Sequence, residues 1–185
     1  IPSLLSTLVE GDVALVSDAG TPCINDPGQE LVSAASQAGV RVITVPGPSA
    51  ATSALAISGL PAEQYVYLGF LPRKRIERQR LLESLASEMR ALLVFETPHR
   101  LRASLQDVKG VLGDRHIAVC RELTKLHEEV FRGSVSEALA YFEKPRGEFT
   151  LVIEGGAAEM VSANSATREM LERLRSEGLG AKESV

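Results

Sequence analysis

Residues 13–28 read VALVSDAGTPCINDPG, and this segment gives the clearest indication of the fold class. The apolar run Val13–Val16 is typical of a buried strand. A loop of small and turn-forming residues follows, and Asp26 and Pro27 are the residue types of a helix N-cap and first helical position. A strand that leads through such a loop into a helix is typical of α/β proteins.

The next segment repeats the pattern. Gly39 is expected to end the first helix, Val40–Val45 predicts another strand, and Ser49 predicts the cap of a helix that runs to Ser58. Strands and helices that alternate in this order predict parallel strands joined by right-handed crossovers.

The chain beyond Pro61 predicts a second α/β unit with a mixed sheet. Strands are expected at residues 65–68, 92–95, 116–120, 129–131 and 149–153, and helices at residues 75–88 and from Thr97-Pro98 onward. Ser134 and Glu137 have the spacing of a capping box.

Composition excludes several classes of protein. The chain has 185 residues, 44% of them hydrophobic, so it can bury a core, and its net charge of −4 does not suit a protein that coats nucleic acid by bulk charge. Cys23 and Cys120 are too few for a disulfide framework or a metal-ligand cluster, which fits a cytoplasmic location without a bound metal. No apolar run or leader pattern predicts a membrane association. The start at Ile1 and the helical character of the last residues suggest a piece of a longer chain.

Two loops are candidates for ligand binding because each follows a predicted parallel strand. Residues 18–28 and 45–50 contain no lysine or arginine, so they disfavour a phosphate-bearing nucleotide and favour a neutral or cationic ligand. The alternative explanation is structural, since tight turns, helix caps and close helix–sheet packing use the same small residues.

Six motifs in order resemble one family. They are Ser17–Gly28, Val45–Ala50, Gly69–Pro72, Phe95–Arg100, Arg121–Lys125 and Gly147-Glu148. Together they resemble the bacterial 16S ribosomal RNA small-subunit methyltransferase I family, a branch of the tetrapyrrole methylase-like methyltransferases. The resemblance implies 2′-O-methylation of a cytidine ribose in 16S rRNA, S-adenosylmethionine as methyl donor, and a homodimer.

The resemblance also implies two α/β domains with the donor in the cleft between them. We expect residues 1–62 to belong to an N-terminal donor-binding domain with a parallel sheet, truncated here, and residues 63–156 to form the C-terminal domain. Residues 157–185 are expected to begin a helical extension. Such proteins start with a strand and loop of the type Gly-Thr-Pro-Ile-Gly-Asn, which this chain lacks.

Site residues follow from these motifs by resemblance. The expected donor-binding residues are Asp18, Ala19, Gly20, Thr21, Pro22, Asp26, Pro48, Ser49, Ala50 and Glu96. The expected catalytic residues are Arg121, Glu122, Lys125 and Glu96, because a ribose hydroxyl needs a general base or a nearby cation. The structural alternative for this second set is a surface ion-pair network, and His99 is a further candidate for proton transfer.

RNA binding requires a local concentration of cations. Arg73, Lys74, Arg75, Arg78 and Arg80 lie within eight residues, and with the exception of Arg80 we expect them, together with Arg100, to contact phosphates. Phe70 is a candidate surface for base stacking. Two other functions remain open from sequence: a methyltransferase acting on a tetrapyrrole precursor, and a donor-binding module without catalysis.

Overall fold

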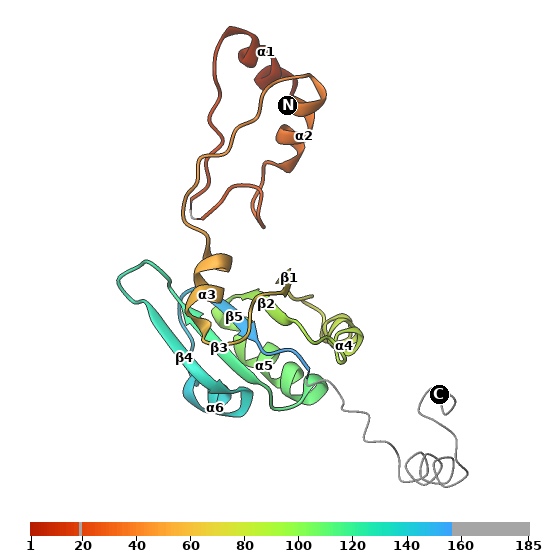
Figure 1. Ribbon diagram of the computed structural model, residues 1–185, viewed down its shortest axis with the longest axis vertical. Helices are drawn as coiled ribbons and strands as arrows, with labels where there is room; N and C mark the ends of the chain where they lie inside the picture. The colour runs from red at the N-terminus through yellow and green to blue at the C-terminus, as the bar shows by residue number, and fades with distance from the viewer. Residues whose placement is uncertain (19, 157–185) are drawn as a thin grey trace, which may run out of the picture.

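A five-stranded mixed sheet forms the centre of the computed structural model, which describes residues 1–18 and 20–156 (Figure 1). The strands are β1 (Tyr65–Phe70), β2 (Ala91–Glu96), β3 (His116–Arg121), β4 (Glu129–Ser134) and β5 (Phe149–Ile153), in the order β1-β2-β5-β3-β4. Only β1 and β2 are parallel; the other neighbouring pairs are antiparallel. The predicted mixed sheet and its five strands are therefore confirmed.

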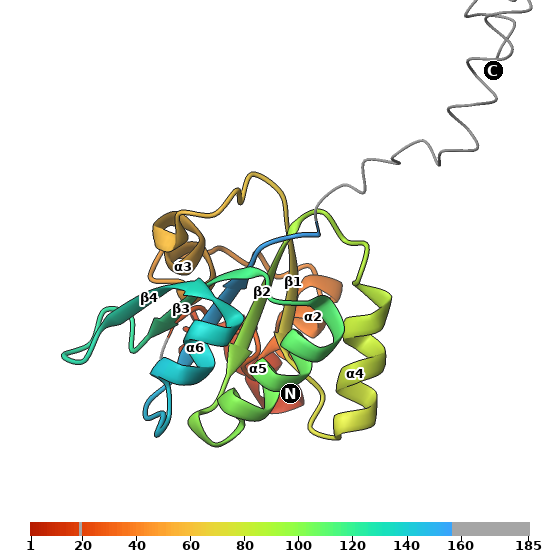
Figure 2. The same cartoon turned by 90° about the horizontal axis from the view of Figure 1, so that it is seen from below.

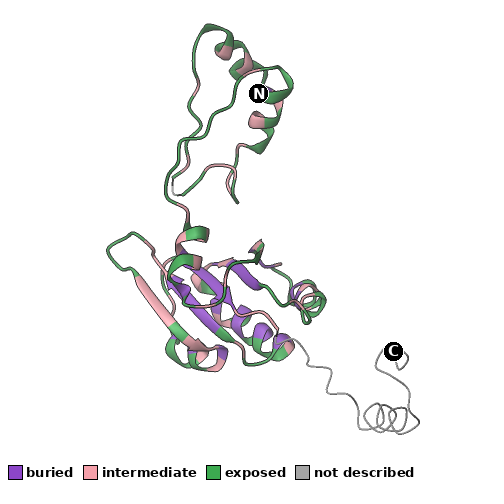
Figure 3. Cartoon of the chain, viewed as in Figure 1, coloured by how far each residue is buried: buried purple, intermediate pink, exposed green. Residues whose placement is uncertain are grey.

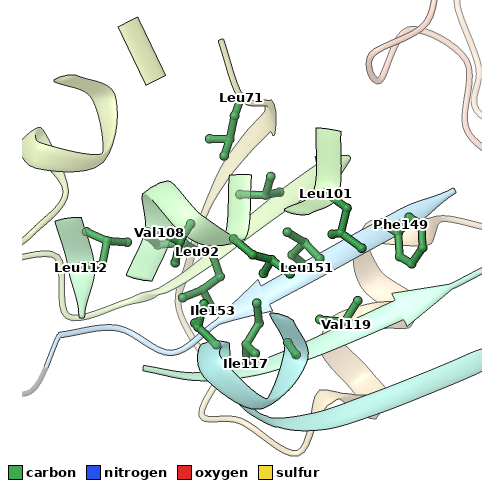
Figure 4. Close-up of a cluster of buried hydrophobic side chains, with 14 of the residues drawn as sticks. Leu71, Leu92, Leu101, Val108, Leu112, Ile117, Val119, Phe149, Leu151 and Ile153 are labelled. Atoms are coloured by element: carbon green, nitrogen blue, oxygen red, sulfur yellow. The ribbon is translucent and has the colours of Figure 1, made fainter. Parts of the chain in front are cut away.

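Three helices cover one face of this sheet. They are α4 (Arg75–Ser84), α5 (Pro98–Leu112) and α6 (Val135–Tyr141), seen together in the view from below (Figure 2). Leucine, isoleucine and valine side chains of α5 and the strands fill the space between the layers (Figure 4). Leu101, Leu105, Leu151 and Val94 are wholly inaccessible to solvent, so removing such a side chain would leave a cavity.

The opposite face is covered in part by α3 (Ala50–Ser58). Ala51 and Ala54 bring the helix close to Leu93, Ala118 and other small or apolar residues of the central strands. The small residues of this segment therefore serve helix–sheet packing. Arg132 of β4 donates to the carbonyl oxygens of Ile57 and Ser58, which holds the end of α3 against the sheet.

Local signals set several helix ends. The predicted capping box is confirmed: the Ser134 hydroxyl accepts from the Glu137 amide at 3.2 Å, and the Glu137 carboxylate accepts from the Ser134 amide at 2.7 Å. Ser49 caps α3 by accepting from the Thr52 amide, also as predicted. The helix predicted over residues 75–88 ends earlier, at Ser84.

The N-terminal segment contains α1 (Pro2–Glu10) and α2 (Gln29–Gln37) and extends away from the sheet (Figure 1). The expected strands at 13–16 and 40–45 are wrong: both segments form no strand, and Val16 and Val45 are 80% and 86% exposed. Figure 3 shows that most of this N-terminal segment is exposed. A strand is stable only within a ladder, and two isolated strands are marginal in water. The parallel N-terminal sheet is thus not formed by the described residues.

The expected N-cap at Asp26 is wrong, and two other expectations fall outside the described residues. Helix α2 begins at Gln29 with Gly28 as its N-cap, so Asp26 does not cap it. Gly28 has a φ of 131°, and a Cβ added there would lie 2.6 Å from the Leu15 side chain. Ala19 and the expected helical extension, residues 157–185, lie outside the described residues.

Candidate active site

The sheet brings most of the sequence motifs to one end. Strand register places Phe70 beside Phe95, Glu96 beside Phe149, and Arg121 beside both Phe149 and Glu129. The loops that follow β1, β2 and β3 and the segment before β5 therefore meet at the same end of the sheet. We call this the motif end of the sheet, formed by residues 70–73, 96–100, 121–125 and 146–148.

The two cation-poor loops of the N-terminal segment touch each other. The Thr21 hydroxyl donates to the Pro48 carbonyl oxygen at 3.2 Å, which joins residues 27 positions apart. Gly20 adopts a φ of 71°, and its carbonyl accepts from the Ser17 hydroxyl. The expected donor-binding residues Gly20, Thr21 and Pro48 thus belong to one surface, as a shared ligand site requires.

The first of these loops also reaches the sheet. The Tyr67 hydroxyl of β1 donates to the Asn25 side-chain oxygen. The Asn25 amide nitrogen lies 2.8 Å from the position of a Cβ on Gly69, which has a φ of 62° at an irregularity in the ladder. Only glycine fits here, which explains the Gly69 of the motif. Burial, with a smaller effect of the Asp26 charge, raises the pKa of Tyr67.

An aromatic surface lies beside this contact. Phe95 packs edge-to-face against Tyr67, with ring centroids 5.5 Å apart, and against Phe70 at 5.9 Å. Phe70 remains 45% exposed. The surface offers a flat group an apolar partner next to the cation-poor loops.

Backbone strain concentrates in two of the motifs. Among the described residues, the non-glycine positions with positive φ are Cys23 (68°), Asn25 (58°), Glu122 (48°) and Thr124 (67°). The first pair lies in the loop at 18–28 and the second in the motif at 121–125. Such strain is common at functional sites, where the surrounding structure holds the loop in one conformation.

Glu96 is not placed to bind a ligand or act as a base. Its side chain is buried, and its carboxylate accepts from the Ser104 hydroxyl at 2.6 Å and from the Thr97 amide at 3.0 Å. Arg100 Nε lies 3.4 Å from the same carboxylate. These contacts fix the first turn of α5 to the end of β2 and give Glu96 a structural role, so we expect it to take no part in catalysis or donor binding.

The expected cluster at 121–125 does assemble, with Glu148 as an additional member. Lys125 Nζ lies 3.3 Å from the Glu122 carboxylate and 2.7 Å from that of Glu148. Arg121 donates to Glu129 at 2.9 Å and to the Arg146 carbonyl at 2.7 Å. The sequence indicated Glu148 only as part of the Gly147-Glu148 motif and gave it no role.

Gly147 permits this arrangement. It has a φ of 83°, and a Cβ there would lie 2.6 Å from Glu122 Cγ. Glu122 also accepts from the Glu148 amide at 2.8 Å. This hydrogen bond, followed by those of the lysine, lowers the pKa of Glu122. Hydrogen bonding to Glu148 and then to Glu122 raises the pKa of Lys125. The cluster therefore holds an ionised carboxylate of low basicity and a persistent cation.

A pH dependence of stability follows from the lowered pKa of Glu122. A carboxyl group with a lowered folded-state pKa stabilises the protein above its unfolded-state pKa and loses that effect as the pH falls through the folded-state value. We expect Glu122→Gln to have a lower free energy of unfolding than the wild type at neutral pH. This difference should narrow only below the ordinary glutamate pKa of about 4.3. Urea unfolding of both proteins between acidic and neutral pH measures this gap. A gap of constant size across the acid range would contradict the assignment.

The expected RNA-binding cations divide into two groups. Arg73, Lys74 and Arg75 are exposed, although Lys74 pairs with Glu77 at 3.0 Å and Arg75 with Asp107 at 3.2 Å. Arg78 is buried; it donates to Asp107 at 2.7 Å and to the Pro72 carbonyl. Arg100 donates to the carbonyls of Leu71 and Pro72. Arg78 is thus unavailable to a phosphate, and Arg100 is occupied in holding the loop after β1.

The described part of the chain offers neither a metal cluster nor a membrane span. No group of three or more histidine, cysteine or acidic residues there is arranged to hold a metal ion. None of the described helices is long and apolar enough to cross a membrane. Both cysteines are free, and burial raises the pKa of Cys120 to about 11, so it is a packing residue.

The family model and the sequence relatives agree on the family. The family model for tetrapyrrole (corrin/porphyrin) methylases matches residues 4–139. Proteins named ribosomal RNA small subunit methyltransferase I are 51% identical in Thermotoga maritima, 51% in Synechocystis and 48% in Mycobacterium tuberculosis. These matches cover 84%, 84% and 92% of this chain and 71%, 57% and 62% of the respective relatives. The chain thus spans little more than half of some relatives.

Solved structures show the same fold. The methyltransferase CobJ matches with a TM-score of 0.64 at 17% identity, covering 84% of this chain and 70% of that protein. The uroporphyrin-III C-methyltransferase of Thermus thermophilus, complexed with S-adenosylhomocysteine, matches with a TM-score of 0.55 at 18% identity over 83% and 70%. The expected tetrapyrrole methylase-like α/β fold is confirmed, apart from the N-terminal parallel sheet. The chain therefore belongs to the tetrapyrrole methylase family and, within it, groups with the ribosomal RNA small subunit methyltransferases I.

Proposed function

We propose that this chain forms part of an S-adenosylmethionine-dependent methyltransferase that methylates the 2′-hydroxyl of a cytidine ribose in 16S rRNA. The observation that carries the proposal is the 51% identity to relatives named ribosomal RNA small subunit methyltransferase I; the cytidine 2′-hydroxyl as acceptor is implied by the sequence resemblance. Such a substrate favours a cytoplasmic protein, and we propose a homodimer by resemblance to the family. The structure supports the site with two features, the joined cation-poor loops and the charged cluster at the motif end of the sheet.

The donor-binding residues fit a sulfonium cation. The two loops carry the carboxylates of Asp18 and Asp26 and no positive side chain. Gly20, Thr21 and Pro48 add backbone and hydroxyl groups, and Asp26 follows Asn25, which contacts Tyr67. S-adenosylmethionine, when bound, supplies an activated methyl group. The loops would hold it, and the Phe70–Phe95 surface gives the adenine ring an apolar neighbour.

Positioning and charge are then the contributions of the chain itself. Methyl transfer would form the oxygen–carbon bond in line as the carbon–sulfur bond breaks, and the hydroxyl proton would pass to solvent water. Glu122 is a weak base because its pKa is lowered, so we assign the larger effect to Lys125. Its persistent positive charge favours the alkoxide form of a nearby hydroxyl.

Calorimetry and methyl transfer test this proposal. We expect S-adenosylmethionine and S-adenosylhomocysteine to bind with heat release and ATP, the phosphate-bearing control, to give none. Labelled methyl should reach small ribosomal subunits that lack the modification. Transfer to a uroporphyrin-type acceptor instead would establish a tetrapyrrole methylase, and donor binding without transfer to either acceptor would establish a binding module.

Charge reversal at Arg73 tests the RNA contact. Arg73 is exposed and, unlike Arg75 and Arg78, does not pair with Asp107. We expect Arg73→Glu to weaken binding of single-stranded RNA roughly fivefold. The slope of log affinity against log salt concentration should fall by about 0.7, the value for one phosphate contact. Fluorescence anisotropy at several salt concentrations measures both. Lys109→Glu, an exposed position near the far end of α5, is the matched control and should bind like wild type.

A further inference from the structure

A pocket of about 320 Å³ adjoins the motif end of the sheet and has no role in the donor site described above. Its lining includes Arg121, Glu129, Tyr141, Phe142, Lys144 and Arg146. These residues come from the end of β3, the start of β4, the end of α6 and the loop before β5. The pocket is therefore built from segments that are distant in sequence.

The pocket carries a positive charge. It contains three cations and one carboxylate, and Glu129 already accepts from Arg121 at 2.9 Å and from the Tyr141 hydroxyl at 2.5 Å. Lys144 and Arg146 are exposed, and neither side chain forms an ion pair with any residue that the structure describes. A cationic methyl donor is disfavoured here, and an anionic ligand is favoured.

The pocket also has a fixed aromatic wall. Tyr141 is 58% exposed, yet its ring packs against Phe142 at a centroid distance of 4.9 Å and against Phe131 at 5.1 Å. Its hydroxyl is held by Glu129. A ring held on one side and exposed on the other is suited to stacking by a nucleobase.

Arg121 connects this pocket to the charged cluster. One end of its guanidinium contacts Glu129 in the pocket wall, and its Nε donates to the Arg146 carbonyl. The next residue, Glu122, contacts Lys125. A polymer that placed a ribose at Lys125 would therefore pass its neighbouring nucleotide close to the pocket.

We infer that this pocket binds one nucleotide of single-stranded RNA adjoining the methylated position, with the base on Tyr141 and a phosphate at Lys144 and Arg146. The inference rests on the proposed rRNA activity and adds a substrate subsite to it. Duplex RNA does not fit, because its stacked bases cannot reach the tyrosine ring.

Binding of a labelled single-stranded oligonucleotide of 16S rRNA sequence to the full chain tests this subsite. We expect the double variant Lys144→Glu/Arg146→Glu to lose about tenfold in affinity and to reduce the slope of log affinity against log salt by about 0.7, for the one phosphate held by both side chains. Lys109→Glu is the charge control. Tyr141→Ala should lose about fivefold or more, whereas Tyr141→Phe, which keeps the ring, should bind like wild type. A 4-thiouridine oligonucleotide should crosslink within residues 141–146.

The outcomes separate this inference from the proposed function. Wild-type RNA affinity in the Lys144→Glu/Arg146→Glu variant would overturn the pocket and leave the methyltransferase proposal standing. Equal binding of the duplex would overturn base stacking at Tyr141. Failure of the wild type to bind RNA, with S-adenosylhomocysteine still bound, would overturn both the pocket and the rRNA substrate. Thermal unfolding and S-adenosylhomocysteine binding should be unchanged in the exposed-charge variants.

Discussion

Replacing Asp107 with alanine is expected to lower the free energy of unfolding by about 3–5 kcal/mol, the usual effect of removing one partner of a buried ion pair. Asp107 and Arg78 are only 4% and 5% exposed, and their side chains meet at 2.7 Å. Asp107 also accepts from Gln79 at 2.9 Å. The substitution would leave the Arg78 charge buried without a counter-ion between α4 and α5. Urea unfolding measures the loss.

Two control variants separate the buried pair from the exposed one. Arg75→Ala removes a partner of Asp107 that is 75% exposed, so we expect a loss of at most about 1 kcal/mol. Replacing both buried groups, as in Arg78→Met/Asp107→Leu, should be far milder than Asp107→Ala alone. If Asp107→Ala and Arg75→Ala had equal effects, the argument from burial would fail.

Substituting Glu96 is expected to cost stability and not donor binding. Glu96→Ala should lower the free energy of unfolding by about 2–4 kcal/mol, because the Ser104 hydroxyl and the Arg100 guanidinium lose a buried partner. Arg100 Nε is buried without a hydrogen-bond partner, so the Glu96 carboxylate is its nearest electrostatic compensation. Thermal unfolding and S-adenosylhomocysteine calorimetry measure the two properties.

The matched control for Glu96 is Ser104→Ala. It removes one hydrogen bond and leaves the carboxylate beside Arg100, so we expect a loss of about 1 kcal/mol. The conservative variant Glu96→Gln should retain the fold and bind donor like the wild type. Loss of donor binding or methyl transfer in a stably folded Glu96→Gln protein would restore the role that the sequence motif indicated.

The second half of the fold was predictable because its signals are local. Apolar runs such as Leu92–Phe95 and Phe149–Ile153 are buried on both faces, and the capping box at Ser134 fixes a helix start without distant partners. The runs at 13–16 and 40–45 look the same in sequence. Whether such a run becomes a strand depends on a neighbouring strand, and no local pattern encodes that neighbour.

The site was predictable as a set of motifs but not as a set of contacts. The loops at 18–28 and 45–50 do touch, and the residues at 121–125 do cluster. The pairing of Arg78 with Asp107 spans 29 residues, and that of Tyr67 with Asn25 spans 42. A run of cations cannot reveal which member faces inward, because helix rotation is set by the packed partner.

The position of β5 has a consequence for synthesis of the chain. Among the described residues it is the last strand in sequence, yet it lies between β2 and β3 and pairs with both. Until residue 153 leaves the translation tunnel, the nascent polypeptide holds a β1–β2 pair and a β3–β4 hairpin, each with an open side ready to accept a foreign strand. Because the sheet closes only after β5 has emerged, this intermediate would be open to such pairing during synthesis.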